Sequence, residues 1–168
     1  MTGYQETITD PSYHRQVVVQ TAPHIGNTGV NDEDPESGRI WVAGYVVRDP
    51  AVRSSNWRAD GELEPDLVQA GVVGISDIDT RALTRHIRDS GALPGAFGAL
   101  GEAPDGSTVD EATLKAAAQA EPGTDGVDLV SEVTTTEPYT VAGGPFRVVA
   151  YDFGIKTTIL RHLSGIAT

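Results

Sequence analysis

The feature that most constrains the fold is an apolar segment, residues 40–47, in which both alternating sets of side chains are apolar. A strand with this pattern is buried on both faces, as in a domain whose sheet is covered by further layers. Arg48, Asp49 and Pro50 follow the segment and end it. We therefore expect a layered α/β domain around this strand.

Shorter segments with strand and helix patterns alternate along the rest of the chain. Strands are expected at residues 16–20, 72–75 (buried) and 96–100, and helices at residues 62–70, 81–90 and 111–120. Asp79 or Thr80 can cap the helix at 81–90, and Gly91 can end it. The acidic and polar residues 31–38 are expected to form an exposed excursion. This alternation agrees with an α/β class.

The C-terminal residues carry a further strand-turn-helix pattern. Residues 146–152 predict a buried strand, and residues 155–163 predict a helix with one apolar face. A βα unit is normally followed by a parallel strand, so we expect a new α/β domain that begins here and is cut short. Residues 138–145, rich in glycine and proline, resemble a linker before it.

Charge and composition exclude several classes of function. The chain has 24 acidic and 12 basic residues, a net charge of -12, which argues against a nucleic-acid-binding face. No apolar run has the length of a membrane span, and the N-terminus lacks a signal-peptide pattern, so we expect a cytoplasmic protein. The chain has no cysteine, which excludes a disulfide scaffold, a cysteine zinc site and a thiol nucleophile.

The titratable residues form no metal or catalytic motif. The four histidines, for which we expect structural or solvent roles, lack zinc-like spacing; they are His14, His24, His86 and His162. Asp77 and Asp79 lie at alternate positions after a strand, and paired acids can bind metal or transfer protons. A helix cap already explains Asp79, so we assign no catalytic residue and no metal site.

Three arginines fall on one face of the helix predicted at 81–90: Arg81, Arg85 and Arg88. They can form a partner surface or contact an anion. The simpler interpretation is a solvated face that balances Asp77, Asp79 and Asp89, and the sequence favours it. Taken alone, the residue motifs indicate only a soluble α/β domain.

Six segments nevertheless match one family in order and spacing. They are residues 1–6, 9–13, 23–27, 78–85, 132–135 and 149–154, the last followed by Lys156. In these segments the chain resembles the small subunit of glutamine-hydrolysing carbamoyl phosphate synthetase, and the resemblance covers nearly its whole length.

This resemblance implies a fold and a division into domains. Residues 1–137 correspond to the N-terminal domain of that subunit, a three-layer swivelling β/β/α domain that here lacks its first strands. Residues 138–145 are then a linker, and residues 146–168 are the first strand and helix of a class I glutamine amidotransferase domain that is truncated in this chain.

The resemblance also implies a function. The family's small subunit releases ammonia from glutamine with a Cys-His-Glu arrangement and passes it to a large subunit. The large subunit, a ligase that uses ATP and a metal ion, joins the ammonia with bicarbonate to form carbamoyl phosphate for pyrimidine and arginine synthesis. This chain lacks the catalytic residues, so we expect it to be inactive alone and to bind no cofactor itself.

One site residue follows from the resemblance. In the segment 9–13 the family's serine holds the glutamine substrate, and here that serine is Ser12. Its hydroxyl can donate or accept a hydrogen bond at the polar end of the substrate. The simpler interpretation is that Asp10, Pro11 and Ser12 form only a turn. For the whole chain, the alternative is a free-standing, non-catalytic binding or scaffold domain of the α/β class.

Overall fold

A three-stranded parallel sheet organises the N-terminal part of the chain. In the computed structural model, which describes residues 2–103 and 106–168, the strands are β1 (Val17–Val19), β3 (Gly44–Val46) and β5 (Val73–Ile75), in the order β1-β3-β5. The register pairs Gly44 with Val17 on one side and with Val73 on the other. Strands β3 and β5 are joined through a helix, α2 (Leu63–Gln69), and this parallel sheet with its helices confirms the α/β class.

Two small strand pairs and seven helical segments complete the described residues. The pairs are β2 (His24–Ile25) with β4 (Asp49–Pro50), parallel, and β6 (Gly101–Glu102) with β7 (Thr108–Val109), antiparallel. The helices are α1 (Tyr4–Thr9), the 3-10 turn η1 (Pro11–Tyr13), α2 (Leu63–Gln69), α3 (Thr80–Ser90), α4 (Glu111–Ala120), α5 (Val130–Val133) and α6 (Thr157–Ser164).

The apolar segment at 40–47 is the central strand, although its regular ladder is shorter than predicted. All three residues of β3 are buried, and so are Val42 and Val47 beside it. Ala43 N–H donates to the carbonyl of Gln16 and Val47 N–H to that of Ile75, each at 2.9 Å. Because both neighbouring strands are only three residues long, the ladder ends where they end.

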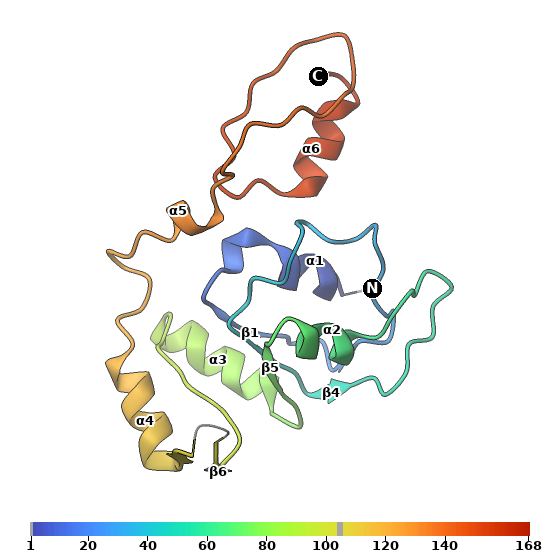
Figure 1. Cartoon of the computed structure of the whole chain (residues 1–168). Helices are drawn as coiled ribbons and strands as arrows, with labels where there is room; N and C mark the ends of the chain where they lie inside the picture. Colours follow the sequence, from blue (N-terminus) through green and yellow to red (C-terminus); the bar gives the residue numbers. More distant parts are fainter. Residues whose placement is uncertain (1, 104–105) are drawn as a thin grey trace.

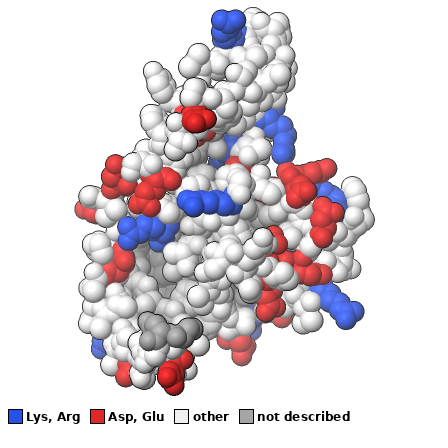
Figure 2. Space-filling model, viewed as in Figure 1, with Lys and Arg blue, Asp and Glu red and all other residues white. Residues whose placement is uncertain are grey.

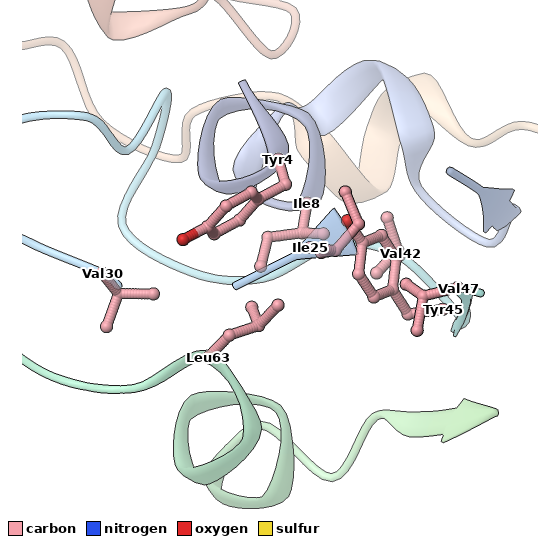
Figure 3. Packing of buried hydrophobic residues seen from close by; sticks show 8 residues of the cluster. All are labelled: Tyr4, Ile8, Ile25, Val30, Val42, Tyr45, Val47 and Leu63. Carbon is pink, nitrogen blue, oxygen red and sulfur yellow. The ribbon is translucent and has the colours of Figure 1, made fainter. Parts of the chain in front are cut away.

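The hydrophobic core lies between α1 and α2, as Figure 3 shows. Tyr4 and Ile8 enter it from α1 and Leu63 from α2; Ile25, Val30, Val42, Tyr45 and Val47 complete it. Burial raises the pKa of Tyr45, an effect that Gln20 partly offsets, and the Tyr45 hydroxyl forms no hydrogen bond of normal geometry with the described residues. The Tyr4 hydroxyl, in contrast, donates to the carbonyl of Gly29.

Strand β5 confirms the strand predicted at 72–75, but its predicted burial and the strand predicted at 96–100 are wrong, because both depended on neighbours that the sequence pattern does not reveal. β5 was expected to be buried, but it is an edge strand and the Val73 side chain is 53% exposed. Residues 96–100 form no strand. Phe97 instead lies over β3: a Cβ atom at Gly44 would be 2.5 Å from Cζ of its ring. Because Gly44 has no side chain, the ring of Phe97 can occupy the space above it.

The acidic segment 31–38 is not the exposed excursion that was expected, because Asn31 and Glu36 are buried in it. Gln5 Nε2 donates to the Asn31 carbonyl at 2.6 Å, and Asn31 N–H donates to Gln5 Oε1 at 3.1 Å. Glu36 N–H donates to Thr9 Oγ1 at 2.9 Å. The polar groups of the segment are thus paired with α1, which allows their burial.

The C-terminal residues lie beyond α1 at one end of the molecule in Figure 1, with α4 and β6 at the opposite end. Helix α6 confirms the helix predicted at 155–163. The buried strand predicted at 146–152 is wrong: Val149 and Tyr151 are 84% and 83% exposed, and Phe146 makes one isolated bridge, to Ala167. In the described part of the chain no strand pairs with this segment, so its apolar side chains remain in solvent.

Candidate functional site

Ser12 lies in a turn that its own neighbours build. Asp10 is the N-cap of η1, and its Oδ1 atom accepts a hydrogen bond from Ser12 N–H at 2.8 Å. Pro11 occupies the first helical position, where its missing N–H costs nothing. The turn interpretation of residues 10–12 is therefore confirmed. The substrate-binding role of Ser12 stays a prediction.

The Ser12 hydroxyl is free for a ligand. The residue is exposed, and its carbonyl accepts a hydrogen bond from Gln16 Nε2 at 2.9 Å. Its Oγ atom makes no hydrogen bond to any residue that the structure describes. The turn thus presents one unused donor and acceptor at the surface.

A second turn, residues 152–156, lies against the segment that carries Ser12. Lys156 Nζ is 3.6 Å from Asp10 Oδ2, so one aspartate carboxylate faces both the Ser12 backbone and an ammonium group. Gly154 has φ +93°, and a Cβ atom there would lie 3.0 Å from Pro11 Cβ and 3.0 Å from Val133 Cγ2. Three segments that are far apart in sequence therefore meet beside Ser12.

The turn at 152–156 is held by the carboxylate of Asp152. Its Oδ1 accepts hydrogen bonds from Gly154 N–H at 2.9 Å and Ile155 N–H at 2.8 Å, and its Oδ2 accepts one from the Tyr139 hydroxyl at 2.6 Å. Partial burial raises the pKa of Asp152, but these three hydrogen bonds outweigh it and the pKa is lowered. The hydrogen bond to Asp152 raises the pKa of Tyr139 to about 12.

An aromatic cluster follows Ser12 along the chain. His14 Nε2 lies 2.8 Å from Glu132 Oε2, and the His14 ring meets that of Trp41 edge to face with centroids 5.2 Å apart. The guanidinium of Arg39 lies 3.6 Å from the centroid of the Trp41 ring, a cation–π contact. These contacts give His14 the structural role that was predicted for it.

The remaining sequence candidates do not gather at this site. Asp79 caps α3 by accepting a hydrogen bond from Ala82 N–H at 2.9 Å, which confirms the cap. Arg81, Arg85 and Arg88 are exposed, and among the described residues Asp89 alone pairs with one of them, Arg88, at 3.5 Å. Over the same residues, no group of three potential ligands could hold a metal ion, and no helix has the length and apolar character of a membrane span.

Two cavities of about 310 and 300 Å³ lie elsewhere, along the acidic segment 31–38, and Asp32 and Asp60 line both. Arg58 closes part of this region, with Nη2 at 2.6 Å from Asp34 Oδ1. Over the face seen in Figure 2, acidic and basic side chains are interspersed. Ser12 lines neither of these two cavities.

The sequence did not reveal which residues would surround Ser12. Lys156, Gly154 and Val133 lie in segments that had each been noted separately, and nothing local predicts that they meet Pro11 and Asp10. The arrangement supplies the Ser12 hydroxyl and the ammonium group of Lys156, which is paired with Asp10. It can orient a polar ligand, and it contains no nucleophile of the thiol type.

Comparison with known proteins identifies related sequences along most of the chain. Residues 1–97 match the family model described as the carbamoyl-phosphate synthase small chain, CPSase domain. The carbamoyl phosphate synthase small chain of Streptomyces avermitilis is 58% identical over an alignment of 159 positions, which covers 93% of this chain and 40% of that protein. The Mycobacterium tuberculosis (strain H37Rv) small chain is 52% identical over an alignment of 172 positions, which covers 98% of this chain and 44% of that protein. The chain thus spans about two fifths of the length of these relatives.

Proposed function

This chain belongs to the carbamoyl-phosphate synthase small chain family, and we propose that it is the N-terminal part of a subunit that hydrolyses glutamine. The ammonia released from glutamine passes to a large subunit, which uses ATP to make carbamoyl phosphate from this ammonia and bicarbonate. Identities of 52–58% to small chains over nearly the whole sequence support this proposal. These identities favour the subunit over a free-standing scaffold domain, because the aligned part of this chain includes the residues around Ser12 and those around Lys156.

The observation that carries the proposal is the unused hydroxyl of Ser12 at the meeting point of two turns. We propose that this hydroxyl hydrogen-bonds the polar end of glutamine, with Asp10 fixing the Ser12 backbone. The reacting thiol must come from outside residues 1–168, because these contain no cysteine. These residues therefore contribute one wall of the glutamine site and no catalytic residue.

The domain division follows from the same family. We propose that residues 1–137 form the swivelling β/β/α domain, that residues 138–145 link it to the next domain, and that residues 146–168 begin the amidotransferase domain. The exposed apolar side chains of Phe146, Val149 and Tyr151 support this, because the strands of an amidotransferase sheet would cover them.

The proposal includes a protein partner, a cellular compartment and the residues that contact the partner. The large subunit is the protein partner, in a cytoplasmic heterodimer that serves pyrimidine and arginine synthesis, and it holds the ATP and the metal ion. The exposed Arg81 and Arg85, which form no ion pair with the described residues, are the docking contacts that we propose. Unpaired guanidinium groups are suited to bidentate binding of carboxylates on a partner.

A chimaera tests the proposal. Residues 1–168 replace the aligned segment of the Streptomyces avermitilis small chain, which is co-expressed with the large chain of that organism. We expect glutamine-dependent carbamoyl phosphate synthesis, and a higher KM for glutamine after Ser12→Ala. The 168-residue chain alone should release no ammonia. A folded chimaera that binds the large chain yet uses ammonia only, while the parent uses glutamine, would contradict the proposal.

A further inference from the structure

Glu36 connects the two halves of the candidate site, although it lies in neither of the two turns. The residue is 7% exposed. Its carboxylate accepts a hydrogen bond from Thr158 N–H at 2.9 Å on Oε2 and one from the Thr158 hydroxyl at 2.8 Å on Oε1. Its carbonyl oxygen accepts two more, from Thr157 N–H at 2.8 Å and the Thr157 hydroxyl at 3.0 Å.

The other side of Glu36 is attached to the helix that precedes Ser12. Glu36 N–H donates to Thr9 Oγ1 at 2.9 Å, and that hydroxyl donates in turn to the Gln5 carbonyl at 2.7 Å. Thr9 ends α1, directly before Asp10, Pro11 and Ser12. One residue therefore bonds to the segment before Ser12 and to the segment after Lys156.

Helix α6 has no N-terminal cap of its own. Its N-cap position is Lys156, whose side chain makes no capping hydrogen bond. The first backbone N–H groups of a helix need acceptors, and a carboxylate there also interacts favourably with the helix dipole. Glu36 supplies both from 122 positions away in sequence, and Arg161 on the next turn donates to the Glu33 carbonyl at 2.9 Å.

We propose that Glu36 is a positioning residue for glutamine binding: it holds α6, and with it the turn at 152–156, in one placement against the Ser12 segment. The inference rests on the proposed function, since it assumes that glutamine binds beside Ser12. Without the carboxylate, the N–H and the hydroxyl of Thr158 at the start of α6 lose their acceptors. Gly154 and Lys156 then lose their fixed position over Pro11 and Asp10.

The contact itself is tested first, in the full 168-residue chain, by hydrogen exchange at the Thr158 amide. Glu36→Ala should reduce protection of this amide by roughly tenfold, because a charge-assisted hydrogen bond is lost. Asp32→Asn is the matched control, since it removes an exposed negative charge from the same segment and should change nothing. Thr158→Val, which removes only one hydroxyl, is the milder variant should Glu36→Ala unfold the chain.

The consequence for glutamine is tested in the chimaera with the Streptomyces avermitilis small chain. Glu36→Ala should raise the KM for glutamine by roughly tenfold with kcat within about twofold, because positioning affects binding before chemistry. Glu36→Gln keeps the shape and one acceptor oxygen and should restore part of the loss. A residue that only stabilises the fold would lower the amount of active enzyme and leave KM unchanged.

The outcomes distinguish the positioning role of Glu36 from the proposed function of the chain. The role of Glu36 is overturned if Glu36→Ala leaves the Thr158 amide as protected from exchange as before. It is also overturned if that protection is lost while the KM for glutamine stays unchanged. Either result leaves the proposed function intact. A chimaera with Glu36 present that binds the large chain but releases no ammonia from glutamine overturns the proposed function, and the role of Glu36 with it.

Discussion

Lys156 Nζ lies 3.6 Å from Asp10 Oδ2, while the other oxygen of the same carboxylate accepts the hydrogen bond from Ser12 N–H. One side chain therefore serves two contacts that can be removed separately. Asp10→Asn keeps an acceptor for Ser12 N–H and removes the charge that attracts Lys156, whereas Asp10→Ala removes both. This difference gives the first prediction.

We expect Asp10→Ala to lower the free energy of unfolding by about 1 kcal/mol more than Asp10→Asn does, because it also removes the cap of η1. The Lys156 side chain is 40% exposed, so solvent screening limits its coupling to Asp10 to about 0.5 kcal/mol. Urea denaturation of Asp10→Asn, Lys156→Met and the double variant measures this coupling. Equal losses for the alanine and asparagine variants would refute the cap.

Gly154 gives a second prediction, because it combines a left-handed backbone with a close approach to Pro11 and Val133. Gly154→Ala should destabilise the protein by about 1–3 kcal/mol, since the added Cβ meets both strain and a tight contact. Gly95→Ala is the control: its backbone φ is not left-handed, and nothing lies within 4 Å of the added Cβ. Thermal unfolding of the two variants should differ clearly, and a matching Tm for both would argue against the contact.

The two core tyrosines should respond in opposite ways to loss of the hydroxyl. Tyr45 is buried with no hydrogen bond of normal geometry to the described residues, so Tyr45→Phe should be neutral or stabilising by up to about 1 kcal/mol. Tyr4→Phe leaves the Gly29 carbonyl and the Thr28 hydroxyl without their partner, and should cost about 1–2 kcal/mol. Denaturant unfolding compares them, and a larger loss for Tyr45→Phe would show that its hydroxyl has a partner.

Acid should loosen the turn at 152–156 through Asp152. Its pKa is below the ordinary value of 3.8 in the folded chain, so the stability that it contributes is present above pH 3.8 and is lost as the pH falls through the lowered value. Carboxyl NMR shifts should place its titration below that of an unperturbed aspartate. Tyr139→Phe removes one of the three hydrogen bonds and should raise the Asp152 pKa, and an unchanged pKa would contradict the contact.

Local signals predicted helices α2, α3, α4 and α6, but not the short helices α1 and α5. Asp79 before α3 and Asp110 before α4 accept hydrogen bonds from the first turns of their helices, and α4 begins and ends where its pattern indicated. A cap requires only residues within one turn of each other, so a single sequence contains the necessary information.

Burial of strands could not be predicted in the same way. The apolar residues of 40–47 do lie in the central strand, but those of 146–152 have the same pattern and are exposed. The apolar pattern shows only that a strand could be buried on both faces, whereas its actual burial depends on which other strands lie beside it. The error at Glu36 has the same origin, because its partners Thr157 and Thr158 are more than a hundred residues away.

The residues Asp10, Pro11 and Ser12 predicted a turn, and this turn is confirmed, whereas the surroundings of Ser12 come from tertiary contacts alone. The meeting of Gly154 with Pro11 requires a left-handed glycine, a proline and a valine from three segments. No local spacing relates them. The turn at Ser12 was therefore predictable from its own residues, and the geometry around it was not; the substrate-binding role of Ser12 stays a prediction.

The space above Gly44 has a consequence for how the chain folds during synthesis. The ring of Phe97 fills it, and Phe97 is also the last residue of the segment that matches the family model. The ribosome makes the chain from the N-terminus, so β1, β3 and β5 are all synthesised before the side chain that covers the middle strand. Until residue 97 has left the exit tunnel, the nascent chain therefore lacks the ring that covers the middle strand at Gly44.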